Sequence, residues 1–477
     1  MRYFLAIIGG GPAGYTAAEK ASKAGKDVIL FEQNALGGTC LNVGCIPTKS
    51  LLYGAKQYYN ATHAQKYGVA AENVTFDFAA MQKRKTIVVR KLVAGIKARL
   101  NNDHCTVING KASVLSTLPC GEGQGGVLVS CNDQTYEAEN LMICTGSTNF
   151  VPPIPGIKDN PAVWDSTDAL AATELPKSVI IVGGGVIGME FATLYHELGV
   201  PVTVIEAMPS ILPNLDPEVV QILLDKYRKA GINILTSTKV ESIDGNTVKL
   251  STSELLSTLS AERILVSVGR RANLQGLEAL NGLELERGAV KVDGFCRTNL
   301  PNVYACGDVT GKIMLAHVAS HQAEVAVSKM LNAPMLNDQM VNEKMINDQM
   351  VNDQMVNDQM VNYLAIPSVV YTNPEIASVG LTENQAADMG FTIEIRKLPM
   401  TFSGRFMAEN EGETGLCKLI LDAEKQTVLG VHCIGNPCSE FIAAASFAVS
   451  KGYTVAEMQQ VVFPHPTVSE ILHEVIV

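Results

Sequence analysis

The sequence predicts an α/β protein made of two similar parallel-sheet units followed by a C-terminal α+β domain. A strand, a glycine-rich turn, a helix and a second strand follow one another over residues 4–32, and this order recurs over residues 178–206. From residue 363 onward, strand-like and helical stretches continue without such a turn. Alternating strands and helices are typical of parallel sheets covered by helices, which accounts for the first two units.

Composition and charge limit the class of protein. The chain of 477 residues is long enough for two to four domains. Its 47% of hydrophobic and 18% of charged residues are typical of a globular enzyme, and its net charge of −11 argues against a nucleic-acid surface. We therefore expect an enzyme that does not bind nucleic acid.

The number of cysteines and the length of the apolar runs indicate in which cellular compartment the protein is located. The eleven cysteines are scattered and odd in number, unlike the disulfide framework of a secreted protein. The apolar start of the chain, residues 3–8, is short and leads directly into a glycine turn, which favours a strand over a signal peptide. No apolar run approaches the length of a membrane span. We expect a cytoplasmic protein that does not enter a membrane.

The first unit carries the fingerprint G-x-G-x-x-G between a strand and a helix. Gly9 makes the turn, Gly11 lets the backbone approach a pyrophosphate, and Gly14 lets the helix pack on the strand. Glu32 ends the next strand, 23 positions after Gly9, where a carboxylate can accept a ribose hydroxyl. The strands and the helix are predicted at residues 4–8, 13–24 and 27–31. This unit is expected to bind a dinucleotide.

The second unit repeats this pattern. Gly183, Gly185 and Gly188 form the turn, and Glu206 again follows the first glycine by 23 positions. An acid at this place favours NAD over NADP, because it would repel a 2′-phosphate and no arginine follows at 207–210. The strands and the helix are predicted at residues 178–182, 186–198 and 202–205. Two fingerprints imply two dinucleotides and two Rossmann-type domains.

Two cysteines lie five positions apart in a small-residue stretch after the first unit. In a regular helix the Cα atoms of Cys40 and Cys45 would be roughly 8–9 Å apart, whereas a disulfide needs less than about 7 Å. A bridge therefore requires a distorted or late-starting helix, for which Gly44 supplies the freedom and Pro47 suits the first turn. A thiol at a helix N-terminus has a lowered pKa.

A redox-active pair is the favoured interpretation of these cysteines, and a structural crosslink or half of a zinc site are the alternatives. A zinc pair usually has two to four spacer residues and a second pair elsewhere, which the sequence lacks. We expect no metal site.

Later segments complete the pattern of elements. Strands are predicted near 141–146, 264–268, 303–308, 366–379, 418–421 and 428–434, and a helix over 439–450. The proline-rich stretch 151–156 is a plausible domain boundary. Between 335 and 362 methionine recurs every five residues, a period that matches neither helix nor strand. We expect a low-complexity surface insertion there; a metal-binding tract or a partner contact are the alternatives.

A histidine lies between two prolines near the C-terminus. Pro464 and Pro466 restrict the backbone around His465, and a helix is predicted from 466 or 467. Glu470, five positions on, can face back to the histidine. A lone histidine is more often structural, but a redox dithiol needs a base near pKa 7, and a carboxylate-oriented imidazole fits that role.

Taken together, these motifs resemble the flavoprotein pyridine nucleotide-disulfide oxidoreductases of class I, and within them the dihydrolipoamide dehydrogenases. The resemblance covers nearly the whole chain except the methionine-rich insertion. Besides the two fingerprints it rests on residues 37–50, 145–147, 269–271, 307–308, 314–317 and 465–470.

The resemblance implies cofactors and the residues that contact them. FAD would be held by Gly9, Gly11, Gly14, Glu32, Gly110, Thr145, Gly146, Ser147, Asp308, Met314, Leu315, Ala316 and His317. NAD would be held by Gly183, Gly185, Gly188, Glu206, Val240 and Gly269. Lys49 would approach the isoalloxazine ring and pair with Glu190.

The resemblance also implies catalytic roles. Cys40 would exchange with lipoamide, Cys45 would be the thiolate beside the flavin, and His465, held by Glu470, would be the base. In a homodimer the histidine would serve the partner subunit's disulfide. The implied reaction is oxidation of protein-bound dihydrolipoamide by NAD⁺, with a lipoyl-bearing acyltransferase or H-protein of a 2-oxo acid dehydrogenase or glycine cleavage complex as partner. The alternative is another NAD(P)H-dependent disulfide reductase, similar to glutathione reductase.

The expected domain organisation follows from the same resemblance. It consists of an FAD-binding domain (1–150), an NAD-binding domain (151–275), a second part of the FAD-binding domain (276–334), the insertion (335–362) and an interface, or dimerisation, domain (363–477).

Overall fold

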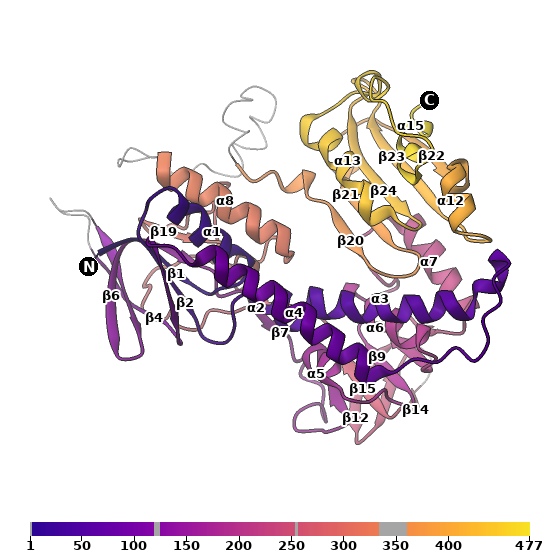
Figure 1. Cartoon of the computed structure of the whole chain (residues 1–477), viewed down its shortest axis with the longest axis horizontal. Helices are drawn as coiled ribbons and strands as arrows, with labels where there is room; N and C mark the ends of the chain where they lie inside the picture. Colours follow the sequence, from indigo (N-terminus) through magenta and orange to yellow (C-terminus); the bar gives the residue numbers. More distant parts are fainter. Residues whose placement is uncertain (1, 119–124, 253–255, 333–359) are drawn as a thin grey trace. The chain divides into compact units, whose positions relative to one another are not determined.

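A computed structural model of the chain describes residues 2–118, 125–252, 256–332 and 360–477. The chain forms two compact units, each assembled from separate stretches of sequence (Figure 1). Unit 1 contains residues 1–47, 83–150 and 270–362, and unit 2 contains residues 48–82, 151–269 and 363–477.

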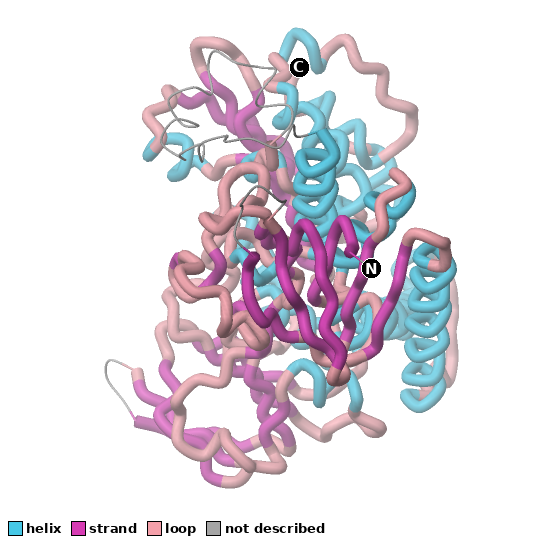
Figure 2. The backbone as a smooth tube through the Cα atoms, turned by 90° about the vertical axis from the view of Figure 1, so that its left-hand side faces the viewer, coloured by secondary structure: helices cyan, strands magenta, loops and turns pink. Residues whose placement is uncertain are grey.

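Unit 1 is built on a sheet with the strand order β3-β2-β1-β6-β5-β4, and β19 also pairs with β6. The first strand, β1, runs parallel to both neighbours and lies inside the sheet, and Figure 2 shows strands of a sheet beside the N-terminus. Strands β4, β5 and β6 form antiparallel pairs. The bounds are β1 Arg2–Ile8, β2 Val28–Glu32, β3 Cys105–Asn109, β4 Ser113–Leu118, β5 Gly126–Cys131, β6 Gln134–Ile143 and β19 Val303–Ala305.

The helix that follows β1 packs closely on this sheet because the residues on its buried face have small side chains. Helix α1, Pro12–Lys23, buries Ala13, Gly14, Ala17, Ala18, Ala21 and Ser22. It packs against α8, Ala316–Asn332, where the Thr16 hydroxyl donates to Ser320 Oγ at 3.2 Å. Unit 1 also contains α2 Gly38–Val43, α4 Phe78–Leu100 in its larger part, β7 Ser147–Asn149, β16 Arg270–Ala272, β17 Leu285–Glu286, β18 Ala289–Val290 and η2 Asp308–Thr310.

The first part of unit 2 repeats the strand–helix–strand arrangement. Its parallel sheet has the order β11-β10-β9-β15-β8, and a small antiparallel sheet has the order β12-β13-β14. The strands are β8 Val163–Trp164, β9 Val179–Val182, β10 Val202–Ile205, β11 Asn233–Leu235, β12 Lys239–Asp244, β13 Thr247–Ser251, β14 Leu256–Ser260 and β15 Arg263–Val266. The helices are α3 Cys45–Thr62, most of which belongs to this unit, α5 Ser166–Ala171, α6 Val186–Glu197 and α7 Pro217–Lys229.

The second part of unit 2 is an antiparallel sheet packed against a helix. The strand order is β20-β21-β24-β23-β22, and α13, Cys438–Lys451, covers strands β21 and β24. The strands are β20 Ser368–Val370, β21 Ile376–Gly380, β22 Ile393–Pro399, β23 Leu416–Asp422 and β24 Val428–Ile434. The short helices are η1 Ala64–Tyr67, η3 Tyr363–Ala365, α11 Glu383–Asp388, η4 Met400–Phe402, α12 Gly404–Glu409, α14 Val455–Met458, η5 Val468–Glu470 and α15 Ile471–Glu474.

The predicted fold class is therefore confirmed: two Rossmann-type units and a C-terminal α+β domain. The strands predicted at 202–205 and 428–434 have these bounds in the structure. The helix predicted from 466 or 467 begins one residue later, at Val468, and its first turn is 3-10. The methionine-rich insertion lies outside the described residues except for its last three positions, 360–362. Within the described ranges, every helix is too short or too polar to cross a bilayer.

Candidate active site

The first glycine turn has the geometry that its sequence predicts. Gly9 has φ +108°, and a Cβ placed there would lie 2.1 Å from the carbonyl oxygen of Cys144. A Cβ on Gly14 would lie 1.8 Å from the carbonyl oxygen of Gly9. At Gly11 the nearest atom to such a Cβ is 3.9 Å away. The outer two positions thus require glycine for the fold, whereas Gly11 leaves room for a phosphate to approach the backbone.

Glu32 closes this turn. Its carboxylate accepts the backbone N–H of Gly10 and of Asn34, each at 2.7 Å. Gly110 follows β3 and donates its N–H to the Glu32 carbonyl at 2.9 Å, so the structure brings Gly110 beside the end of β2. A carboxylate has about four acceptor sites, and two of these therefore stay available for ribose hydroxyls.

The other residues expected at the FAD site belong to unit 1, and two of them form a small polar cluster with Arg270. The Ser147 hydroxyl donates to Asp308 Oδ2 and accepts from Arg270 Nε at 2.7 Å. The neighbouring Thr145 hydroxyl donates to the carbonyl oxygen of Asn273. Gly146, with φ +71°, lets the chain turn between them. Met314 and Leu315 precede α8, and Ala316 and His317 begin it.

The second glycine turn matches the first. Gly183 has φ +109°, and a Cβ there would lie 2.6 Å from the carbonyl oxygen of Ser267. A Cβ on Gly188 would lie 2.0 Å from the carbonyl oxygen of Gly183, whereas one on Gly185 would meet no atom within 4 Å. The second turn thus also leaves open space beside its middle glycine, as a bound pyrophosphate requires.

Glu206 repeats the contacts of Glu32. Its carboxylate accepts the N–H of Gly184 and of Met208, each at 2.7 Å. The Glu206 carbonyl accepts the N–H of Thr238 at 3.0 Å, which brings β12, and Val240 within it, toward this turn. Gly269, with φ +124°, follows β15, and a Cβ placed there would meet no atom within 4 Å. This part of unit 2 fits the expected NAD site.

The cysteine stretch has the helix break that a Cys40–Cys45 pair needs. Helix α2 ends at Val43, Gly44 has φ −143° and ψ −116°, and α3 begins at Cys45. A Cβ on Gly44 would lie 2.8 Å from the carbonyl oxygen of Thr39, so glycine is required at the break. Cys40 and Cys45 are both partly exposed. Cys45 lies at a helix N-terminus, where partial positive charge favours the thiolate.

Lys49 and Glu190 form an ion pair. Lys49 Nζ donates to both carboxylate oxygens of Glu190, at 2.8 and 2.7 Å, and lies 4.7 Å from the ring centre of Tyr371. Glu190 is only 4% exposed. The Lys49 side chain is 30% exposed, so the buried partner is Glu190, whose carboxylate would be left without a cation if Lys49 were removed.

His465 and Glu470 also lie together. His465 Nδ1 is 2.8 Å from Glu470 Oε1, and the other carboxylate oxygen accepts the N–H of Thr467 at 2.7 Å. These two hydrogen bonds, with the Thr467 N–H as the larger cause, lower the pKa of Glu470. The carboxylate is therefore ionised at neutral pH and accepts Nδ1–H, which leaves Nε2 to take a proton. The His465 side chain is 80% exposed.

Two residues of this arrangement were not predicted as site residues, although Arg270 lies in the stretch 269–271 that supports the resemblance. Arg270 holds Ser147 and Asn149, and Tyr371 contacts Lys49 through its ring and Glu190 through its backbone N–H. Tyr371 and Glu190 are 181 positions apart, and a contact made by a backbone N–H leaves no pattern of residue types.

Comparisons with known proteins agree with this geometry. Residues 3–323 match the family model "Pyridine nucleotide-disulphide oxidoreductase", and residues 366–476 match "Pyridine nucleotide-disulphide oxidoreductase, dimerisation domain". Dihydrolipoyl dehydrogenases of Geobacillus stearothermophilus and Bacillus subtilis are each 35% identical over 476 residues, covering 98% of this chain and 94% of theirs.

Solved structures give the same result. The Cu(II) complex of the HOCl-induced flavoprotein disulfide reductase RclA from Escherichia coli is 29% identical, with a TM-score of 0.81 and coverage of 100% and 99% of the two chains. LpdA of Mycobacterium tuberculosis shares the fold, with a TM-score of 0.86, 24% identity and 99% coverage of both chains. Because both family models match in order and the glycine turns and the helix break at Gly44 agree with them, the chain belongs to the pyridine nucleotide-disulphide oxidoreductase family.

Proposed function

We propose that this protein oxidises protein-bound dihydrolipoamide to lipoamide with NAD⁺, through a redox-active Cys40–Cys45 disulfide and FAD. The observation that carries the proposal is the helix break at Gly44, which begins α3 at Cys45 and gives the second cysteine the environment of a thiolate. The 35% identical relatives, which are dihydrolipoyl dehydrogenases, support the substrate class.

The cysteines carry the exchange step. A substrate thiolate attacks Cys40 Sγ of the disulfide, which forms an intermolecular disulfide and releases Cys45 as a thiolate. The second substrate thiol then displaces Cys40 and closes lipoamide. His465 Nε2 takes the proton from the substrate thiol, since Glu470 already holds Nδ1–H. In total the dithiol loses two electrons and two protons; NAD⁺ receives a hydride and one proton goes to water.

The cofactors occupy the two glycine turns in this proposal. Bound FAD supplies the two-electron chemistry between the dithiol and NAD⁺. The first turn with Glu32 and the Ser147–Asp308 cluster holds FAD, and the second turn with Glu206 holds NAD. Open space beside Gly11 and Gly185 supports both assignments. Lys49, fixed by Glu190, directs its charge to the flavin.

The chain acts as a homodimer. The match of residues 366–476 to a dimerisation domain supports this, and so does the exposed ring of His465, which is oriented within its own chain and open to a partner's disulfide. A lipoyl-bearing acyltransferase or H-protein of a multienzyme complex supplies the substrate. We place the protein in the cytoplasm, because its eleven scattered cysteines are unlike the disulfide framework of a secreted protein.

The experiment is a steady-state assay of the purified yellow holoenzyme. We expect turnover with dihydrolipoamide and NAD⁺, and little with glutathione or NADP⁺. Cys45→Ser should keep FAD and lose lipoamide turnover, and His465→Ala should slow turnover by about 10²–10⁴. Cys105→Ser is the matched control, because burial raises the pKa of the Cys105 thiol to about 11 and keeps it unreactive.

Other outcomes have clear meanings. Preference for NADP⁺ and glutathione would replace this proposal with the glutathione reductase-like alternative. Loss of FAD from Cys45→Ser, with Cys105→Ser intact, would instead make the cysteine pair a structural element.

A further inference from the structure

Helix α6 carries two buried acids on one face, and both are bound by a single short segment. Glu190 and Glu197 are seven residues, or two turns, apart, and are 4% and 6% exposed. The backbone N–H of Tyr371 donates to Glu190 Oε1 at 3.1 Å, and the amide of Asn373 donates to Glu197 Oε1 at 2.7 Å. Residues 371–373 thus run along α6, because an extended stretch of this length spans about two helical turns, ~10 Å.

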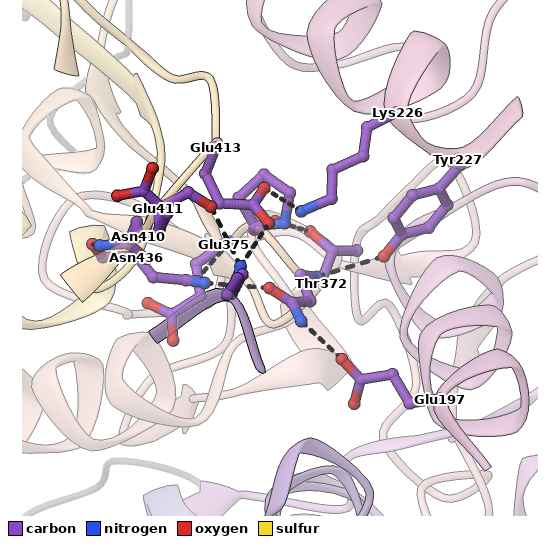
Figure 3. A network of polar contacts seen from close by, with 12 residues as sticks. Glu197, Lys226, Tyr227, Thr372, Glu375, Asn410, Glu411, Glu413 and Asn436 are labelled. Carbon is purple, nitrogen blue, oxygen red and sulfur yellow. Dashed lines mark hydrogen bonds and ion pairs between the residues drawn. The ribbon is translucent and has the colours of Figure 1, made fainter. Parts of the chain in front are cut away.

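A third contact holds the Asn373 end of this segment from another helix. The Tyr227 hydroxyl, on α7, accepts the backbone N–H of Asn373 at 3.2 Å. It lies 2.5 Å from Thr193 Oγ1, whose own proton goes to the Met189 carbonyl at 2.8 Å, so Tyr227 donates to Thr193. Figure 3 shows Tyr227 and Glu197 reaching from two helices toward the chain at Thr372.

These contacts enclose the ion pair described above. Glu190 binds Lys49 Nζ through both oxygens, and the Tyr371 ring lies 4.7 Å from the same nitrogen. The Glu190 carboxylate and the Tyr371 ring, which both contact the Lys49 ammonium group, therefore depend on the position of residues 371–373. Tyr227, Thr193 and Thr372 are no more than 4% exposed, so water cannot replace a lost hydrogen bond without a rearrangement.

We infer that Tyr227 and Glu197 are positioning residues, which hold residues 371–373 on α6 and thereby set the place of the Lys49 ammonium. The inference rests on the proposed function, in which Lys49 acts at the flavin. Neither residue is expected to touch substrate or cofactor. Displacements of about 1 Å at a catalytic group can cost up to 10²-fold in rate, so a loosened segment is expected to lower kcat.

The test compares Tyr227→Phe with Tyr67→Phe in the FAD-loaded enzyme. Tyr67, which is 45% exposed, controls for the loss of a bridging hydroxyl: it also joins two parts of unit 2, donating to the Glu409 carbonyl at 2.7 Å and accepting from the Glu411 N–H at 3.3 Å. It makes none of the contacts to residues 371–373. Both variants lose one hydroxyl, and only Tyr227→Phe leaves the Asn373 N–H without its acceptor.

For Tyr227→Phe we expect faster hydrogen exchange at the amides of Tyr371 and Asn373, a shifted flavin absorption band at full FAD content, and a kcat lowered about ten-fold at unchanged KM. Tyr67→Phe should show none of these changes. Equal effects in the two variants would reduce Tyr227 to a general structural role and overturn the inference. Faster exchange with an unchanged flavin band and kcat would overturn it as well.

A second pair of variants keeps the test valid if Tyr227→Phe does not fold. Glu197→Gln keeps an oxygen acceptor for Asn373, whereas Glu197→Ala removes it. We expect Glu197→Ala to reproduce the exchange and flavin changes and Glu197→Gln to rescue them; identical behaviour of the two would contradict the inference. A wild-type enzyme without lipoamide turnover would refute the proposed function alone, since exchange and flavin absorption are measured without substrate.

Discussion

Helices α1 and α6 follow the same glycine turn, yet they have very different surroundings. The buried face of α1 is formed by alanine, glycine and serine only. In α6 nine of twelve residues are buried, among them Met189, Phe191 and Tyr195 and the acids Glu190 and Glu197. Helix α6 belongs to a core that also includes residues of α3, α7 and the C-terminal sheet.

This difference shows that one local motif serves two purposes. Both turns provide the same open space beside the middle glycine and the same pair of N–H bonds to a strand-end acid. Only α6 continues from the turn into polar contacts that reach another domain of unit 2. We therefore expect changes in the turns to act on one dinucleotide each, and changes further along α6 to act on the C-terminal domain.

The largest effect is expected where a methyl group collides with backbone. Gly14→Ala and Gly188→Ala each place a Cβ within 2.0 Å of a carbonyl oxygen, and overpacking costs about 1–3 kcal/mol or more. We expect about a hundred-fold weaker binding of FAD in the first variant and of NAD⁺ in the second. The flavin content of Gly14→Ala measures the first effect, and the KM of Gly188→Ala for NAD⁺ measures the second. Loss of FAD from Gly188→Ala would show that the two turns are not independent.

A smaller effect is expected at the open position of the second turn. Gly185→Ala adds a methyl group with no atom within 4 Å, so the protein should keep its melting temperature. Because this methyl group would occupy the space of the pyrophosphate, we expect a KM for NAD⁺ raised about ten-fold at unchanged FAD content. An unchanged KM would move the NAD site away from this turn.

The smallest effect concerns the acid at the end of α6. Burial raises the pKa of Glu197 from 4.5 to about 7, although the bond from Asn373 and the charges of Lys56 and Lys226 act in the opposite direction. The pKa of the nearby Tyr59 is raised by burial and, to a smaller extent, by the negative charges of Glu413 and Glu197.

The sign of the pH effect follows from this shift. The folded state holds a proton on Glu197 that the unfolded chain has lost above pH 4.5, so this stabilising contribution is present at low pH and disappears as pH rises through about 7. Glutamine does not ionise. We expect Glu197→Gln to melt roughly 1–3 °C above the wild type at pH 8 and within error of it at pH 5, by calorimetry. A larger gain at pH 5 than at pH 8 would contradict the raised pKa.

Much of the fold could be predicted from short stretches of sequence. The glycines at positions 9 and 183 need positive φ, and those at 14 and 188 need contact with backbone, which are properties of a few consecutive residues. The break at Gly44 follows from the same reasoning, since a helix through both cysteines would keep them too far apart. Helix α4, Phe78–Leu100, was not predicted, because only Ile96 and Leu100 of its residues are buried and its apolar periodicity is weak.

The sequence by itself determined the two glycine turns, the acids that close them, the cysteine pair at a helix break and the histidine with its carboxylate, because each depends on residues close together in the chain. Only the tertiary structure decided that Tyr371 and Asn373 lie along α6 and that Tyr227 holds them there. These partners are 146 to 181 positions apart, and their contacts arise from burial and from the need to satisfy buried hydrogen-bonding groups, which have no period in the sequence.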